Sequence, residues 1–107
     1  MLERYRPSGA GPSPEVRARS WFKVELFGES GEARVVAEVR GGDPGYDETA
    51  KMISECGLAL AYDRASLPAS GGLSTPAAAF GDVLLDRLVA AGIEFRLVEA
   101  TGAGAAD

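Results

Sequence analysis

Two stretches of alternating apolar and polar residues, separated by a short glycine-containing loop, constrain the fold of this chain more than any other feature. In residues 20–28, SWFKVELFG, and in residues 33–40, ARVVAEVR, apolar side chains occupy every second position. Because successive side chains of a strand point to opposite faces, this period of two is typical of a half-buried strand. The loop between the stretches begins with the turn signal Gly28-Glu29-Ser30-Gly31, so the sequence predicts an antiparallel hairpin. The apolar face of the hairpin would hold Phe22, Val24, Leu26, Val35, Ala37 and Val39.

A helix over residues 44–62 is predicted to follow the hairpin. Asp43 and Pro44 have the pattern of an N-cap followed by a proline at the first helical position. Acidic residues at positions 47 and 48 suit the positive end of the helix dipole. One apolar stripe at helical spacing consists of Tyr46, Ala50, Ile53, Gly57 and Leu60.

The second half of this helix, residues 56–62 (CGLALAY), is apolar on every side. A helix that is apolar all round needs cover all round. Such cover is difficult in a chain of 107 residues, because a chain of this size buries only about 65% of the surface that it exposes when unfolded. Either the strand layer and a second helix cover it completely, or its extra face meets a second copy, a separate partner or solvent.

A second helix and a third strand are predicted in the C-terminal half. Thr75-Pro76 repeats the pattern of a cap followed by proline, and Gly92 stands where a helix-terminating glycine belongs, so a helix is expected over residues 77–91. Its inward positions are Phe80, Leu84, Leu88 and Ala91. Residues 93–98 alternate again and predict a strand with Ile93, Phe95 and Leu97 on one face.

The expected fold class is therefore α+β: a small mixed or antiparallel sheet in the order ββααβ, with two helices packed on one face. The length supports one domain, expected over residues 15–99. A flexible N-terminal arm over residues 1–14 and a flexible tail over residues 100–107 would flank it. Near Ser13 the sequence allows either a short helical turn through Arg19 or an extended run into the first strand.

Composition excludes several classes of function. The net charge is −5, and the arginines are scattered rather than clustered, which argues against nucleic-acid binding. No apolar run reaches the roughly 18 residues that span a bilayer, and the N-terminus lacks the apolar segment of a secretory signal, so we expect a cytoplasmic protein with no membrane partner. The chain has no histidine and one cysteine, Cys56, which removes histidine-based catalysis, an internal disulfide, histidine metal sites and thiolate metal clusters. Cys56 itself is expected to be a small buried hydrophobe.

Two predicted helix starts carry the candidate ligand-binding residues. Asp43, Tyr46 and Thr49 surround a glycine-rich turn, where exposed amides could hold an anionic group; alternatively, Asp43 is only the helix cap. Thr75 either caps the second helix or faces a ligand. If the two helix starts converge, they would form one anion or substrate pocket. We read Lys51 as solvated, and we assign no catalytic residue, cofactor site or metal site to the chain.

Two long motifs resemble the C-terminal end of saccharopine dehydrogenase-like oxidoreductases, whose bacterial branch is called trans-acting enoyl reductase. The motifs are GGDPGYDETAKM (residues 41–52) and GGLSTPAAAFGDVLLDRLVAAGIEF (residues 71–95), in that order after the hairpin that Trp21 begins. The resemblance covers residues 11–98. It implies an α/β region that, in full-length members, follows an N-terminal Rossmann domain and also serves dimerisation.

The resemblance does not bring the cofactor site with it. A Rossmann fingerprint has the pattern G-x-G-x-x-G between a strand and a helix. The G-x-G patterns of this chain are Gly9-Ala10-Gly11, in the predicted N-terminal arm, and Gly102-Ala103-Gly104, after the last predicted strand, and neither continues to the third glycine. We therefore expect no NAD(P) binding by the chain alone, and a partner that is a second copy or a separate Rossmann-domain protein. The expected function is that of a substrate and dimerisation module. The alternatives are a small cofactor-independent enzyme or ligand-binding protein, such as a cyclase or isomerase, and a truncated remnant.

Overall fold

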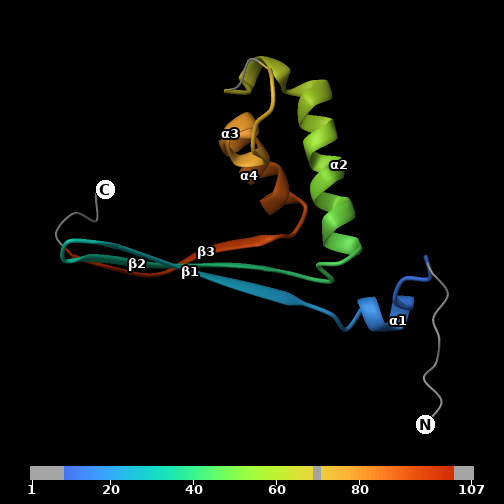
Figure 1. Cartoon of the computed structure of the whole chain (residues 1–107), viewed down its shortest axis with the longest axis horizontal. Helices are drawn as coiled ribbons and strands as arrows, with labels where there is room; N and C mark the ends of the chain where they lie inside the picture. The colour runs from blue at the N-terminus through green and yellow to red at the C-terminus, as the bar shows by residue number, and fades with distance from the viewer. Residues whose placement is uncertain (1–8, 69–70, 103–107) are drawn as a thin grey trace, which may run out of the picture.

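The computed structural model describes residues 9–68 and 71–102 and has an α+β architecture (Figure 1). The hairpin strands and the long helix lie where the sequence predicts them. The elements in chain order are α1 (Pro14–Arg17), β1 (Phe22–Ser30), β2 (Ala33–Gly41), α2 (Asp47–Tyr62), the 3₁₀ helix η1 (Arg64–Ser66), α3 (Pro76–Phe80), α4 (Asp82–Ala90) and β3 (Glu94–Thr101). The predicted order ββααβ is met only roughly, because α1 and η1 are added and the second helix is divided.

The three strands form one antiparallel sheet in the order β1-β2-β3. Ser30 pairs with Ala33, so the hairpin loop is the two-residue turn Gly31-Glu32. Gly31 has a φ of 60°, a conformation that glycine adopts without steric cost. The turn signal over residues 28–31 thus marked the right region, but Gly28 and Glu29 belong to the strand.

The register gives the sheet one apolar and one charged face. On the apolar face, three cross-strand rows lie side by side: Val24, Val39 and Phe95; Leu26, Ala37 and Leu97; Gly28, Val35 and Ala100. On the opposite face, the corresponding rows include Lys23, Arg40 and Glu94, and next to them Glu25, Glu38 and Arg96. A bulge between Val36 and Ala37 places Val98 as an extra residue in β3.

Charges of opposite sign lie next to one another on the charged face, which allows Glu38 to be buried. Only 5% of Glu38 is exposed, although it is a strand residue that alternation would place in solvent. Its carboxylate accepts a 2.9 Å hydrogen bond from Nη2 of Arg40, and Nζ of Lys23 lies 3.8 Å from it. These cations supply the partners that a buried carboxylate needs.

The helices cover only one end of the apolar face. In Figure 1, α2, α3 and α4 rise from one end of the sheet, and the hairpin extends well beyond them. The chain measures 58 × 37 × 24 Å, and its radius of gyration is 18.1 Å, against about 13 Å for a compact domain of this length. The buried core is correspondingly small and consists of Ala59, Phe80, Leu84, Leu88 and Ile93. The helices therefore leave the distal half of this face uncovered.

Three boundaries differ from the sequence-based expectation. The long helix begins at Asp47 rather than at residue 44, because residues 43–46 form a turn before it. The second helix divides into α3 and α4 at Gly81, whose φ of 53° breaks the helical path. β3 continues to Thr101, so Ala100 and Thr101 are strand residues rather than tail. The remaining parts of the predicted arm and tail, residues 1–8 and 103–107, lie outside the described residues.

The apolar stripe identified on α2 faces away from the core. Ile53 is 71% exposed and Leu60 56% exposed, and the added Cβ of a residue at Gly57 would meet nothing within 4 Å. The face that packs is a different one, formed by Met52, Cys56 and Ala59. Because residues 56–62 are apolar all round, periodicity did not distinguish the two faces.

Candidate functional site

The candidate residues at the start of α2 are engaged in local hydrogen bonds. Asp43 is 7% exposed, and its Oδ2 accepts hydrogen bonds from the backbone N–H groups of Tyr46, at 2.7 Å, and Asp47, at 3.2 Å. These are among the amides that an anion would have to use. Asp43 therefore caps the turn that leads into α2, whereas the N-cap of the helix itself is Tyr46 and not Asp43 as predicted.

The neighbouring side chains are also used locally. Thr49 donates a hydrogen bond from its hydroxyl to the carbonyl of Pro44. The ring of Tyr46, which is half exposed, lies against Gly11, where a Cβ would approach the ring carbon Cζ to 2.7 Å. Lys51, expected to be solvated, instead forms a 2.7 Å ion pair with the buried Glu48. Glu48 also accepts a 3.1 Å hydrogen bond from the N–H of Gly42.

Thr75 lies far from this cluster. Its Oγ1 accepts a 3.4 Å hydrogen bond from the N–H of Ala78, as a helix cap does. The loop before it borders a small pocket of about 230 Å³ lined by Leu60, Leu67, Gly71, Gly72, Ser74, Ala79 and Phe80. Leu60 is in the last turn of α2, whereas Tyr46 immediately precedes its first turn, and a 16-residue helix is about 24 Å long. The two helix starts do not converge, and the single pocket considered for them does not form.

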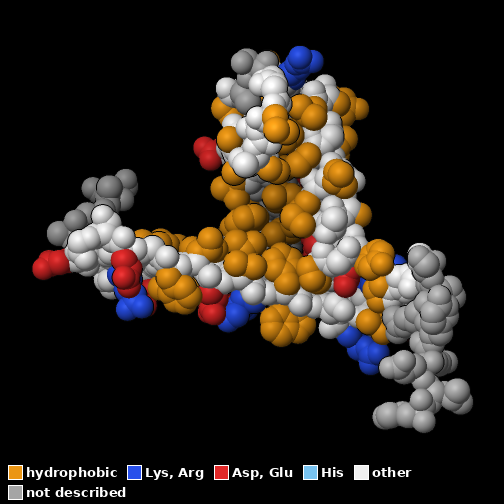
Figure 2. All heavy atoms as spheres, in the orientation of Figure 1, with side chains coloured by type: hydrophobic (Ala, Val, Ile, Leu, Met, Phe, Trp, Pro, Cys, Tyr) orange, Lys and Arg blue, Asp and Glu red, His pale blue; other side chains and the backbone are white. Residues whose placement is uncertain are grey.

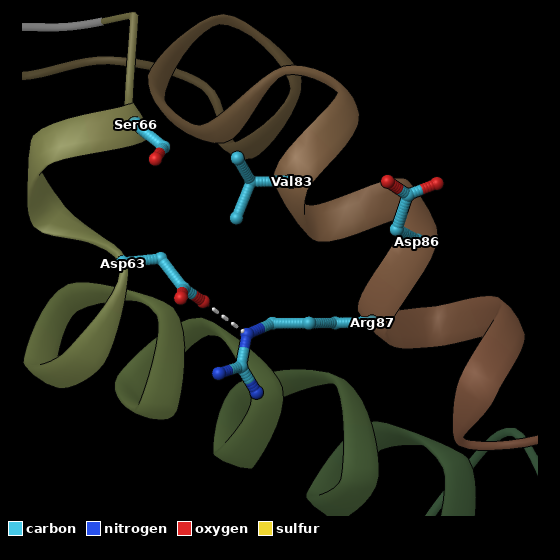
Figure 3. Close-up of a pocket in the computed structure, with 5 residues that line it drawn as sticks. All are labelled: Asp63, Ser66, Val83, Asp86 and Arg87. Atoms are coloured by element: carbon cyan, nitrogen blue, oxygen red, sulfur yellow. Dashed lines mark hydrogen bonds and ion pairs between the residues drawn. The ribbon is translucent and has the colours of Figure 1, made fainter.

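A second pocket lies between the end of α2, η1 and α4. Its lining includes an ion pair between Arg87 and Asp63 (Figure 3). The guanidinium of Arg87 donates from Nε to Oδ2 of Asp63 at 2.7 Å and from Nη1 to Oε2 of Glu55 at 2.9 Å. Hydrogen bonding to Asp63, and then to Glu55, raises the pKa of Arg87 above its ordinary value. The guanidinium of Arg87 is already paired with two carboxylates. These ion pairs link α4 to α2, and the guanidinium is not free to bind an anion in the pocket.

Cys56 behaves as the sequence indicates. It packs against the core, and desolvation raises the pKa of its thiol above the ordinary value. A raised pKa lowers the thiolate fraction at neutral pH and hence the reactivity of the thiol. Within residues 9–68 and 71–102, no group of three histidine, cysteine or acidic side chains is arranged to hold a metal ion.

The apolar face of the sheet stays exposed in its distal half, beyond the helices. This distal apolar face consists of the rows Leu26, Ala37 and Leu97, and Gly28, Val35 and Ala100. It contains a shallow groove of about 410 Å³ lined by Leu26, Ala37, Glu38, Val39, Phe95, Arg96 and Leu97. Leu97 is 67% exposed, Leu26 50% and Val24 49%. In Figure 2, apolar side chains continue from the flank of the helices onto this face. Contiguous exposed apolar surface of this kind marks an interaction site.

No local signal in the sequence could have revealed this surface. The helices predicted over residues 44–62 and 77–91 are long enough to lie along most of a nine-residue strand, which is about 30 Å long, and only the structure shows that they rise away from the sheet (Figure 1). The alternation of the two strands predicted the apolar face of the hairpin, and two helices were expected on one face of the sheet, but their extent along it was not predicted. The sequence pattern placed the problem of missing cover on α2, where Leu60 and Tyr62 are indeed exposed.

No helix in the described part of the chain is long and apolar enough to cross a bilayer.

Comparison with known proteins relates the chain to part of a larger enzyme. No family model matches it, and no solved structure does. A Mycobacterium tuberculosis protein with trans-acting enoyl reductase in its name is 46% identical over 99 residues, which cover 90% of this chain and 24% of that protein. The trans-acting enoyl reductase of Mycobacterium ulcerans is 42% identical over 94 residues, which cover 86% of this chain and 22% of that protein. The trans-acting enoyl reductase of Mycobacterium leprae is 39% identical over 95 residues, which cover 87% of this chain and 23% of that protein. The chain thus spans about a quarter of the length of the curated relatives it matches and is similar to one segment of trans-acting enoyl reductases.

Proposed function

We propose that this chain is a non-catalytic module of the trans-acting enoyl reductase type, which supplies substrate and dimerisation surfaces to a cofactor-binding protein. The observation that carries the proposal is the 46% identity over 99 residues to a segment of such a protein. In this proposal the segment corresponds to the C-terminal part of a saccharopine dehydrogenase-like oxidoreductase. The partner is a second copy or a separate Rossmann-domain protein.

The distribution of exposed apolar surface supports a role in assembly. The distal half of the sheet presents Leu26 and Leu97 to solvent, and the outer face of α2 presents Ile53 and Leu60. An isolated domain gains stability by burying such side chains, at roughly 25 cal/mol per Å² of apolar area. Surfaces that stay exposed in the monomer are therefore available to a partner, as a module of a larger assembly requires.

The chemistry of enoyl reduction also calls for a partner. Addition of hydride to an enoyl group requires a bound hydride donor such as a reduced nicotinamide, and neither Gly9-Ala10-Gly11 nor Gly102-Ala103-Gly104 continues into a dinucleotide fingerprint. The alternative of a cofactor-independent enzyme draws little support from its candidate residues. Asp43 and Thr49 are engaged in local hydrogen bonds, and Thr75 caps α3.

A chimera tests the proposal. The matching segment of the Mycobacterium ulcerans trans-acting enoyl reductase would be replaced by this chain, and NADPH-dependent reduction of an enoyl substrate would be measured. We expect the chimera to keep at least a tenth of the parent's kcat/KM, while a parent that lacks the segment is inactive. A folded chimera that binds NADPH as the parent does but reduces no enoyl substrate would contradict the proposal.

Calorimetry of the isolated chain completes the test. We expect no heat of NADPH binding to the chain alone at concentrations where the parent reductase is saturated. Micromolar binding of NADPH by the isolated chain would show a cofactor site of its own and would remove the need for a Rossmann partner.

A further inference from the structure

We infer that two copies of this chain dimerise through the distal apolar face of the sheet, with the helices of each copy covering the open sheet of the other. This inference rests on the dimerisation role in the proposed function and assigns a surface to it. The contact rows are Leu26, Ala37 and Leu97, and Gly28, Val35 and Ala100. The second copy is the occupant to which the observations below point.

The lack of charged side chains makes this face the part of the surface on which a second copy can bind without repulsion. Each copy carries a net charge of −5, so most of its surface repels a second copy. The two distal rows contain no charged side chain, and charged residues such as Glu25, Glu29 and Arg34 point to the opposite face of the sheet. Two such faces can therefore be brought together without placing like charges opposite one another.

Side-chain size on this face also suits sheet-on-sheet packing. Across the two rows, the small residues Gly28, Ala37 and Ala100 alternate with Leu26, Leu97 and Val35. Packed sheets interdigitate the side chains of their inner faces. A two-fold arrangement that sets the large residues of one copy over the small residues of the other would fill the space between the sheets.

The area of the sheet face indicates that the helices take part. Three strands are about 14 Å wide, and the distal half is about 15 Å long, so its footprint is on the order of 200 Å². A standard interface buries about 800 Å² per partner. Contact between the sheets alone is too small for a stable dimer, and a second surface on each copy must contribute.

The flank of α4 supplies that second surface. Val83 packs on the core, and Arg87 is paired with Glu55 and Asp63 on the side of α2. Leu85 lies two positions after Val83, and Val89 lies two positions after Arg87, so both are about 200° round the helix from those residues. They are 40% and 52% exposed. The helices and the sheet form an L (Figure 1), and two L-shaped copies related by a two-fold axis can each cover the open arm of the other.

Sedimentation equilibrium of the full chain, with a reductant present to keep Cys56 reduced, tests the inference. We expect a monomer–dimer equilibrium with a dissociation constant in the micromolar range, as suits a small interface. Because the contact is apolar, that constant should change less than threefold between 50 and 500 mM NaCl. A monomer at 200 µM would overturn the inference.

Matched variants on neighbouring residues of β1 locate the surface. Leu26→Glu places a charge on the apolar face and should weaken dimerisation at least 30-fold, whereas Phe27→Glu, at a 64% exposed position on the other face, should change it less than threefold. Leu97→Ser, at a more exposed position on the apolar face, should weaken dimerisation about tenfold. It replaces Leu26→Glu as the test if circular dichroism shows the Leu26→Glu variant to be unfolded. A dimer that survives both face variants but is broken by Ile53→Glu on α2 would overturn the assignment.

The outcomes also separate this inference from the proposed function. An active chimera together with a monomeric chain refutes the dimer surface and leaves the module role intact. A dimer with the expected response to Leu26→Glu, together with an inactive chimera, supports the surface and refutes the reductase role. If the isolated chain stays monomeric but Leu26→Glu inactivates the chimera, the same face binds the cofactor-bearing part instead, and the inferred occupant is wrong.

Discussion

Arg87 on α4 donates a 2.7 Å hydrogen bond from Nε to Oδ2 of Asp63, the residue that ends α2. Together with the contact between Arg87 and Glu55, it ties two helices whose shared core holds few buried residues. The three side chains are between 20% and 35% exposed, so solvent screens part of the attraction.

Loss of this link should be measurable in the free energy of unfolding. We expect Arg87→Ala to lower that free energy by more than the control variant below, since hydrogen bonds to charged groups stabilise a fold even where solvent screens part of the attraction. Urea unfolding followed by circular dichroism measures the change. Arg64→Ala, at an exposed position of η1, is the control and should change the value by less than about 0.5 kcal/mol. Equal losses in the two variants would show that the link has no special role.

The pH dependence of this contribution has a definite sign. The folded-state pKa of Arg87 is raised above its ordinary value, so its stabilising effect is complete below that ordinary value and is lost only as the pH rises through the folded value. The difference in unfolding free energy between the wild type and Arg87→Ala should therefore be constant from about pH 6 to about pH 9. A difference that declines between these limits would mean that Arg87 acts through a group that titrates there.

The cap residue Asp43 offers a second test of stability. Its carboxylate satisfies two backbone N–H groups that helix formation leaves without partners. We expect Asp43→Ala to destabilise the fold by about 1–2 kcal/mol and Asp43→Asn by less, because the amide oxygen can still accept. Thermal unfolding of the two variants checks this order. If the variants were equally stable, the capping role of Asp43 would be excluded.

Two glycines should respond in opposite directions to substitution by alanine. Gly57 lies on the exposed face of α2, where a Cβ meets nothing within 4 Å, so Gly57→Ala should stabilise the fold by about 0.5–1 kcal/mol. At Gly41 a Cβ would lie 2.5 Å from Cε1 of Phe22, so Gly41→Ala should destabilise it by about 1–3 kcal/mol. Melting temperatures of the two variants, measured at low protein concentration, give the comparison. A destabilising Gly57→Ala would indicate that another molecule packs closely against this face of α2.

The thiol of Cys56 should react slowly in the native chain. Desolvation raises its pKa, so at pH 8 we expect modification by a disulfide reagent to be at least about tenfold slower than in the urea-unfolded chain. Because the folded pKa is raised, the related contribution to stability is complete below the ordinary value of 9.0 and is lost as the pH rises above it. Equal rates in the native and unfolded chains would show that the packing around Cys56 opens readily.

The candidate site was only partly predictable from the sequence. The pattern at Thr75 identified a helix cap, and the pattern at Asp43 identified a capped turn just before the helix, because such patterns report hydrogen bonds between residues close together in the chain. Whether the two helix starts converge depends on the path of the intervening helix and loop, and the structure keeps them at opposite ends of α2. The Arg87–Asp63 contact joins residues 24 positions apart and had no local signal that could have revealed it.

The sequence by itself determined the strands, the hairpin and the two faces of the sheet, because alternation is a local property that fixes which side chains share a face. Only the tertiary structure decided how far the helices extend over that face and which side of α2 packs inward. Residues 56–62 are apolar all round, so burying either side of that helix would satisfy the hydrophobic effect about equally. The choice depends on where Phe80, Leu84 and Leu88 arrive from the other helices. That same choice leaves Leu26 and Leu97 in solvent, where a partner can bind them.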